Sequence, residues 1–115
     1  MALIVQKYGG TSVGDVDRIR GVAQRVKGYV DQGHQVVVVV SAMSGETNRL
    51  VSMGRDIGGD HGSAREMDVL TASGEQVTIS LLSLGLLSIG VQAKSFLAVQ
   101  ISIKTYNVHG KARIQ

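Results

Sequence analysis

Five consecutive valines, Val36 to Val40, constrain the fold of this 115-residue chain more than any other feature. A strand with one face in water alternates apolar and polar residues, whereas an unbroken apolar run is typical of a strand that is buried on both faces. Such strands occur in parallel sheets that helices cover on both sides. The valine run therefore predicts a central strand of an α/β protein with both of its faces buried.

The residues before the valine run predict a strand, a glycine loop and a helix. Residues 3–6 form a short apolar run that ends at Gly9-Gly10, which is typical of a buried strand that breaks into a loop. Apolar residues then recur at helical spacing at Val16, Ile19, Val22, Ala23, Val26 and Val30. Either Ser12 or Asp15 can cap the start of this helix, and Gly33 stands where a C-terminal cap belongs.

The second half of the chain continues the alternation. We predict a helix from Glu46 to Ile57 and a third helical segment from Arg65 to Ile89, broken near Ser73-Gly74. Val91 to Phe96 and Ile101 to Thr105 are candidate strands. Strands that alternate with helices favour a parallel sheet with right-handed crossovers. The predicted fold class is therefore α/β, in a single domain.

Composition narrows the function classes. The chain has no cysteine, which excludes disulfides and Cys-ligated metal sites and fits a cytoplasmic location. Its net charge of +3 is dispersed and its aromatic content is 3%, so it offers neither the basic stripe nor the stacking platforms of a nucleic-acid-binding protein. The three histidines are isolated and lack metal-ligand spacing. We expect no nucleic-acid partner and no metal ligands.

A membrane partner is not expected either. The most apolar stretch, Ile79 to Val91, is interrupted by serines and glycines and is shorter than the roughly 20 apolar residues that cross a bilayer. The N-terminal residues 1–7 lack the basic region and the long apolar run of a signal peptide.

The loop after the first predicted strand has the ingredients of a phosphate cradle. Gly9 and Gly10 let the backbone approach an anion, and the next helix presents free N–H groups there. Lys7 can place a compact positive charge on a phosphoryl group. The loop is not a P-loop, because Asp15-Val16 replaces the required Lys-Ser/Thr pair. A tight turn would also explain the glycine pair, so the residues alone leave both interpretations open.

The loop after the valine strand carries Ser41 and Thr47. These residues can serve a ligand, or they can be a turn hydroxyl and an ordinary first-turn helix residue. Arg65 can likewise pair with Asp68 on a helix surface, and Glu75 can simply be exposed. The residue types by themselves do not choose between these readings.

Taken in order, these segments resemble the aspartate kinases of the amino-acid kinase family. The blocks that carry the resemblance are Val5–Val13, Val36–Met43, Arg65–Asp68 with Ser73–Gln76, and Gly110–Ile114. The resemblance covers residues 1–115 and implies a partial amino-acid kinase domain, the N-terminal lobe of an αβα sandwich, with no regulatory domain.

The resemblance implies transfer of the ATP γ-phosphoryl group to the β-carboxylate of L-aspartate, the first step towards lysine, threonine and methionine. ATP would be the co-substrate, and magnesium would accompany it. By position, the residues facing the ATP phosphates would be Lys7, Tyr8, Gly9, Gly10, Ser12 and Ser41. Lys7 would be catalytic, because phosphoryl transfer depends on positioning and electrostatics. Thr47, Glu75 and Arg65 would bind aspartate, Glu75 through the substrate ammonium group.

Two departures from the family pattern shape the expectation. Leu97–Ser102 stands where the family has a Thr-Gly-x-Gln-Ala-Gly segment, and of that segment only Gln100 matches. The family's remaining site residues, adenine pocket and regulatory domains lie beyond the position of Gln115. We therefore expect an aspartate kinase that needs a C-terminal half or a complementing chain, with no turnover by the isolated chain.

Other readings stay open. The first is a non-catalytic truncated remnant, or a split-enzyme subunit, that keeps only phosphate-binding elements. The second is an unrelated phosphate-binding α/β module. An incomplete parallel sheet would expose an edge and an apolar face, so we also expect self-association.

Overall fold

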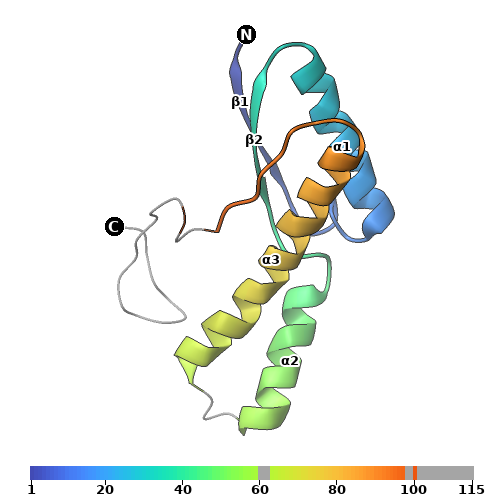
Figure 1. The fold of residues 1–115 in the computed structure, drawn as a ribbon. Coiled ribbons are helices and arrows are strands. Elements are labelled where there is room, and N and C mark those ends of the chain that lie inside the picture. Colours follow the sequence, from blue (N-terminus) through green and yellow to red (C-terminus); the bar gives the residue numbers. More distant parts are fainter. Residues whose placement is uncertain (60–62, 98–99, 101–115) are drawn as a thin grey trace.

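The computed structural model describes residues 1–59, 63–97 and 100. The elements are, in chain order, β1 (Leu3–Tyr8), α1 (Val16–Asp31), β2 (Gln35–Val40), α2 (Glu46–Gly58) and α3 (Ala64–Ser88) (Figure 1). The two strands pair in parallel, with Leu3 opposite Gln35 and Tyr8 opposite Val40. The strands, their connecting helix and the predicted α/β class are therefore confirmed.

Local signals set the ends of α1. The Asp15 carboxylate accepts a hydrogen bond of 2.8 Å from the backbone N–H of Arg18, so Asp15 rather than Ser12 is the cap. Gly33 follows the helix with a φ of +88°, a left-handed conformation that favours glycine. This turn lets the chain run straight into the valine strand.

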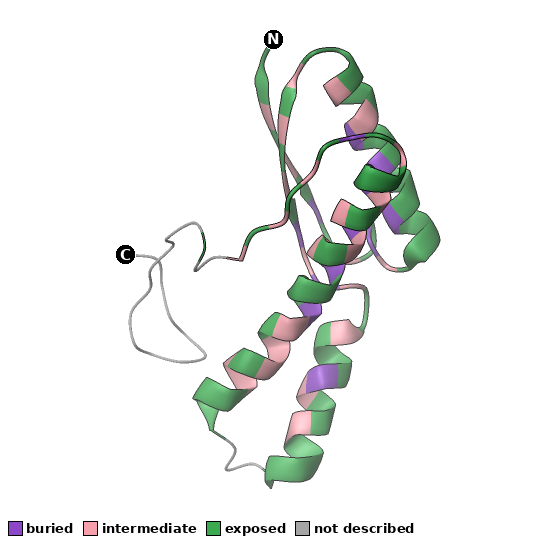
Figure 2. Ribbon diagram, viewed as in Figure 1, coloured by how far each residue is buried: buried purple, intermediate pink, exposed green. Residues whose placement is uncertain are grey.

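The hydrophobic core lies between one face of the sheet and two helices. α1 and α3 both cover this face, and α2 packs against α3 (Figure 1). The core consists of Tyr8, Val13, Ile19, Val22, Ala23, Val26, Val40, Leu82, Leu86 and Val91. Figure 2 shows these buried positions gathered where α1 and α3 approach the strands. Aliphatic side chains therefore form nearly all of this core.

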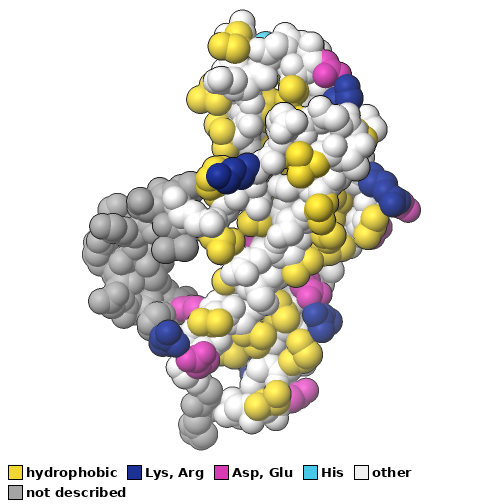
Figure 3. Space-filling view, in the orientation of Figure 1, with side chains coloured by type: hydrophobic (Ala, Val, Ile, Leu, Met, Phe, Trp, Pro, Cys, Tyr) yellow, Lys and Arg dark blue, Asp and Glu magenta, His cyan; other side chains and the backbone are white. Residues whose placement is uncertain are grey.

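The opposite face of the sheet is uncovered by the described residues. Val37 and Val39 are each 48% exposed, and Leu3 and Val5 are each 65% exposed. Figure 3 shows hydrophobic side chains at the surface both beside β1 and over α3. The prediction that the valine strand is buried on both faces is therefore wrong for the described structure, because both helices that contact the sheet lie on the same side.

The predicted break in α3 is also wrong. The helix is continuous through Ser73 and Gly74, and the Ser73 hydroxyl donates to the Leu70 carbonyl at 2.6 Å within the same helix. Gly74 is buried where α3 packs against Ala42 and Leu50. The glycine therefore serves close packing, and the helix passes through it without interruption.

The segment after α3 differs from the prediction as well. Residues 91–97 are described but form no strand, so the candidate strand Val91 to Phe96 is wrong. Gly90, at a φ of +86°, turns the chain back so that the N–H of Val91 donates to the Leu86 carbonyl at 3.0 Å. Val91 is consequently buried in the core. The candidate strand Ile101 to Thr105 and the block Gly110–Ile114 lie outside the described residues.

α3 extends well beyond the apolar stretch considered from the sequence. By length and composition alone it could cross a membrane, with a mean hydropathy of 1.2 over its most apolar window. One side of the same helix supplies Thr78, Leu82 and Leu86 to the buried interior. Only 22% of that window is buried within the described structure, and Leu84 and Leu87 are 63% and 47% exposed, so packing accounts for only part of the apolar character of α3.

Candidate functional site

A cavity of about 460 Å³ opens at the carboxyl ends of the two strands. The loop after β1, the loop after β2, the first turn of α2 and the middle of α3 form its walls. Its lining residues are Gly10, Thr11, Ser41, Ala42, Met43, Ser44, Gly45, Thr47, Asn48 and Glu75. Ligands of open α/β sheets bind at this edge. Parallel pairing brings the two loops together here, because both strands end at the same level.

Polar side chains without protein partners surround this cavity. Ser41, Thr47, Asn48 and Glu75 make no side-chain hydrogen bond or ion pair within the described part of the chain. Three hydroxyl or amide groups and a carboxylate therefore remain available to a ligand. Such convergence of polar groups in a hollow is the usual mark of a small-molecule site.

The cavity also receives the positive end of a helix. α2 begins after Gly45, and no side chain caps its N-terminus. The N–H of Glu46 donates to the Met43 carbonyl, which leaves further first-turn N–H groups for an anion. With the free Glu75 carboxylate also lining the cavity, the site has complementary partners for both charges of an amino-acid zwitterion.

Glu46 stands beside this helix end but is already paired. The Arg49 guanidinium donates to its carboxylate at 2.9 Å, and this hydrogen bond lowers the pKa of Glu46. The same contact raises the pKa of Arg49. Glu46 is not among the lining residues of the cavity, so Glu75 is the one carboxylate among the described lining residues, and it makes no ion pair with them.

The glycine loop is held by its own backbone and by α1. The N–H of Ser12 donates to the Gly9 carbonyl at 3.0 Å, and the Arg18 guanidinium donates to the Thr11 carbonyl at 2.8 Å. A Cβ on Gly10 would lie 3.1 Å from the Ala42 carbonyl oxygen, so this glycine allows the two loops to touch. A Cβ on Gly9 would meet nothing within 4 Å. The space beside Gly9 is therefore open.

The predicted phosphate-binding residues divide into two groups. Gly10 and Ser41 line the cavity, whereas Lys7, Tyr8, Gly9 and Ser12 are outside its lining. Lys7 is exposed on the uncovered face of the sheet, opposite Val39. The Tyr8 ring is buried in the core and its hydroxyl donates to Gln6 at 2.8 Å, so only its backbone remains near the loops.

The predicted aspartate-binding residues also divide. Thr47 and Glu75 line the cavity together, although they come from different helices. Arg65 lies in the first turn of α3, about 15 Å along the helix axis from Glu75. Its guanidinium donates to Glu66 at 2.6 Å, so the helix-surface pairing considered for Arg65 is made with Glu66.

Sequence reasoning missed Asn48 as a lining residue. The available signal was its position directly after Thr47 in the first turn of a helix that follows a strand-end loop. Residues at that position commonly face the ligand edge of an α/β sheet. Met43, Ser44 and Gly45 also line the cavity. The loop that contains them was singled out from the sequence, but these three residues were not named individually.

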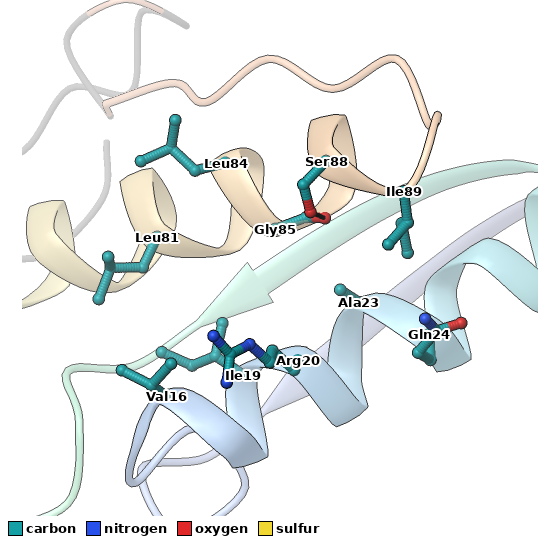
Figure 4. A pocket seen from close by; sticks show the side chains of 10 residues that line it. All are labelled: Val16, Ile19, Arg20, Ala23, Gln24, Leu81, Leu84, Gly85, Ser88 and Ile89. Carbon is teal, nitrogen blue, oxygen red and sulfur yellow. Dashed lines mark hydrogen bonds between the residues drawn. The ribbon is translucent and has the colours of Figure 1, made fainter.

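A second hollow, of about 350 Å³, lies between α1 and α3 (Figure 4). Its walls are mostly aliphatic, including Ile19, Leu81 and Leu84. Two of its polar lining side chains already bind other protein groups. Arg20 forms an ion pair with Asp17 at 3.0 Å, and the Ser88 hydroxyl donates to the Gly85 carbonyl at 2.7 Å. The chemistry of the described residues is therefore concentrated at the strand ends.

The family follows from comparison with known proteins. The model of the amino acid kinase family matches residues 2–114, and the chain belongs to this family. Within it, the chain is similar to the aspartokinase of Pseudomonas aeruginosa, with 55% identity over 99% of the chain, and to aspartokinase 2 of Bacillus subtilis, with 54%. The chain spans 27% and 28% of the lengths of these two relatives. The resemblance to the N-terminal part of aspartate kinases is confirmed.

Solved structures agree on the fold. The aspartate kinase of Synechocystis superimposes with a TM-score of 0.78 at 53% identity, over 82% of this chain and 16% of that one. Aspartokinase III of Escherichia coli, in complex with aspartate and ADP, gives a TM-score of 0.83 at 23% identity, over 98% of this chain and 35% of that one. At that identity the second match shows the fold alone.

Proposed function

We propose that this chain provides the phosphate-binding loop and the aspartate-binding cavity of an aspartate kinase. The proposal is carried by one observation: the N-terminus of α2, which no side chain caps, and the carboxylate of Glu75, which has no ion-pair partner, lie at the same cavity. L-aspartate has an ammonium group for Glu75 and a carboxylate for the N–H groups of α2. The likeness to aspartokinases at 55% and 54% identity supports this choice of ligand, and the E. coli enzyme of the same fold was solved with aspartate and ADP.

The proposed reaction transfers the γ-phosphoryl group of ATP to the β-carboxylate of L-aspartate. A carboxylate oxygen attacks the γ-phosphorus, the bond to the β-phosphate oxygen breaks, and aspartyl phosphate and ADP are the products. Positioning and charge stabilisation supply most of the catalysis in such transfers. The glycine loop would cradle the phosphates beside Gly9, and Ser41 would lie between nucleotide and amino acid. Lys7, which has no partner among the described residues, would neutralise the transferred group.

Magnesium fits this scheme as part of the nucleotide complex. The described residues contain no group of three or more His, Asp, Glu or Cys side chains that could hold a metal ion. Magnesium commonly retains waters and binds through substrate phosphates rather than an all-protein cage. We therefore propose that the ion enters with ATP and that the described residues contact the phosphates.

Turnover is proposed to need more polypeptide than the described residues supply. The support is the uncovered face of the sheet, where Val37 and Val39 are half exposed. A further segment, a complementing chain or a second copy would cover it. We place the enzyme in the cytoplasm, in amino-acid biosynthesis towards lysine, threonine and methionine. The same uncovered face supports a second candidate, a non-catalytic binding subunit or remnant that retains ligand binding without phosphoryl transfer.

Ligand titration tests the proposal. Backbone amide spectra of the purified chain are recorded with L-aspartate and, separately, with ADP and magnesium. We expect aspartate to shift Thr47, Asn48 and Glu75, and ADP to shift Gly9 and Gly10. Glu75→Gln should weaken aspartate binding by about tenfold to a hundredfold, because a charged hydrogen bond is lost.

The matched control is Glu66→Gln, which removes a carboxylate from the same helix outside the cavity. This variant should bind aspartate as the unsubstituted chain does. Equal losses in both variants, or no binding of either ligand, would contradict the proposed site. Aspartyl phosphate formation by the purified chain would exclude the non-catalytic alternative and would also contradict the proposal that turnover needs more polypeptide.

A further inference from the structure

We infer that Gly74 is a positioning residue that sets the width of the proposed aspartate cavity. Because Gly74 has no side chain, Ala42 can pack directly against α3. The inference builds on the proposed function. A Cβ placed on Gly74 would lie 3.0 Å from the Cβ of Ala42 and 3.3 Å from Cδ1 of Leu50. The nearer atom is fixed to the backbone of Ala42, so no side-chain rotation can relieve that contact.

Ala42 is confined from its other side as well. It is 6% exposed, and its carbonyl oxygen would lie 3.1 Å from a Cβ on Gly10. The loop after β2 is therefore wedged between two glycines, one in the loop after β1 and one in α3. A movement of Ala42 away from Gly74 is restricted by the loop that carries Gly10, so the whole segment must shift.

This wedge joins the two walls of the cavity. Ala42 follows Ser41 and leads, within a few residues, to Thr47, whereas Gly74 directly precedes Glu75. A methyl group on Gly74 would push the loop and the first turn of α2 away from α3. The groups that hold the two ends of the amino acid would then move apart by a few tenths of an ångström. The nucleotide phosphates, placed beside Gly9, would be affected far less.

Gly74 suits such a test because its backbone is helical and carries no positive φ. Alanine has the higher helix propensity, so Gly74→Ala introduces no backbone strain of its own. Any loss of binding then reports the displaced loop. Gly85 offers a matched control in the same helix, since a Cβ there would make only an ordinary contact of 3.7 Å with Ala23.

A second control perturbs the same pair of helices elsewhere. A Cβ on Gly54 of α2 would lie 2.6 Å from Sδ of Met67 in α3. Met67 is a flexible side chain that can move aside, and Gly54 is not among the lining residues of the cavity. Gly54→Ala therefore crowds the helix pair without acting on the cavity wall.

The first measurement compares dissociation constants for L-aspartate and for ADP with magnesium. Gly74→Ala should weaken aspartate binding by about threefold to tenfold, because the neighbouring loop must move by a few tenths of an ångström, and should weaken ADP binding by less than about twofold. Gly85→Ala and Gly54→Ala should match the unsubstituted chain. Adding Ala42→Gly to Gly74→Ala removes the closest contact and should restore aspartate binding.

The second measurement needs no ligand. The chain has no cysteine, so Thr47→Cys with Glu75→Cys creates a unique thiol pair. Bismaleimides of graded length should link this pair with a longer optimum in the Gly74→Ala background, and Ala42→Gly should reverse the change. Ala42→Ser, which adds an atom at the same contact from the opposite side, should reproduce the effect if Gly74→Ala does not fold.

The outcomes separate this inference from the proposed function. Unchanged cross-linking together with unchanged aspartate affinity in Gly74→Ala overturns the positioning role. Equal losses for aspartate and ADP, or a failure of Ala42→Gly to rescue, also overturn it, because they indicate general destabilisation. If the unsubstituted chain binds neither ligand, the proposed function fails, and the cross-linking result still decides whether Gly74 sets the spacing of the two walls.

Discussion

The two faces of the sheet carry similar side chains in different surroundings. On one face, Val36, Val38 and Val40 lie against the core formed with α1 and α3. On the other face, Val37 and Val39 are 48% exposed, and the neighbouring residues Leu3 and Val5 are exposed still further. The same residue type therefore builds a core on one side of β2 and a bare apolar surface on the other.

This difference teaches what the valine run encodes. A strand whose second face met only water would carry polar residues at alternate positions. β2 does not, so its composition suits burial on both faces although the described helices cover one. The composition of the uncovered face thus supports the proposal that further polypeptide covers it, and this chain spans only 27% to 28% of the lengths of the relatives.

The largest expected effect is on the covered face. Leu82 of α3 is 5% exposed and packs in the core, and Leu82→Ala should lower the free energy of unfolding by about 3 kcal/mol. Urea unfolding followed by circular dichroism measures the loss. Leu84→Ala, at an exposed position of the same helix, is the control and should have little effect. Comparable losses at both positions would mean that the core is not where the structure places it.

A smaller effect is expected where α1 begins, because this helix covers the same face. Asp15→Ala removes the capping hydrogen bond to Arg18 and should cost about 1 kcal/mol of unfolding free energy. Ser12→Ala removes the alternative predicted cap and should leave the unfolding midpoint unchanged. A loss in the Ser12 variant but not in the Asp15 variant would reverse the assignment of the cap.

The uncovered face should respond differently to a polar change. Val37→Thr combined with Val39→Thr keeps the side-chain shape and should change the unfolding free energy by less than about 0.5 kcal/mol. Sedimentation velocity should show weaker self-association, because the exposed apolar area falls. Val36→Thr with Val38→Thr on the covered face is the matched control and should be clearly destabilising, since it places hydroxyls against the core. Equal responses of the two pairs would remove the distinction between the faces.

The smallest expected effect lies on α2, away from both faces, and concerns Glu46. Its pKa in the folded chain is lowered, so the stability that it contributes is present above the pKa of an unfolded glutamate and is lost as the pH falls through the folded value. Arg49→Gln should move the NMR-observed pKa of Glu46 upward. Arg55→Gln, on the same helix, should not. An unchanged pKa in the Arg49 variant would show that the ion pair is not maintained in solution.

Periodicity predicted the elements whose form depends on local sequence. The strand at residues 3–8, the helix from Val16 and the valine strand follow from spacing and caps within each segment. The continuity of α3 does not, because Gly74 is compatible with either a break or a close contact, and only tertiary packing against Ala42 selects the contact. Which faces of the sheet are covered depends likewise on elements distant in the sequence.

The site was predictable in part for a related reason. The resemblance singled out Ser41, Thr47 and Glu75, and the structure brings them to one cavity. Lys7 and Tyr8 were assigned to the same phosphates, and adjacent residues of a strand point their side chains to opposite faces. Tyr8 accordingly packs in the core while Lys7 is exposed. Strand alternation could have separated them from the sequence alone.

The position of the core has a consequence for synthesis on the ribosome. The apolar stripe of α1, with Ile19, Val22 and Val26, is sealed by Leu82, Leu86 and Val91. Once β1, α1 and β2 have emerged from the ribosome, the two strands can pair. The apolar side chains on the inner face of the sheet and on α1 remain exposed to solvent until the C-terminal end of α3 has also emerged. Translation must therefore pass most of this segment before the barrier to unfolding is established, and the emerging polypeptide is a natural client for chaperones during that interval.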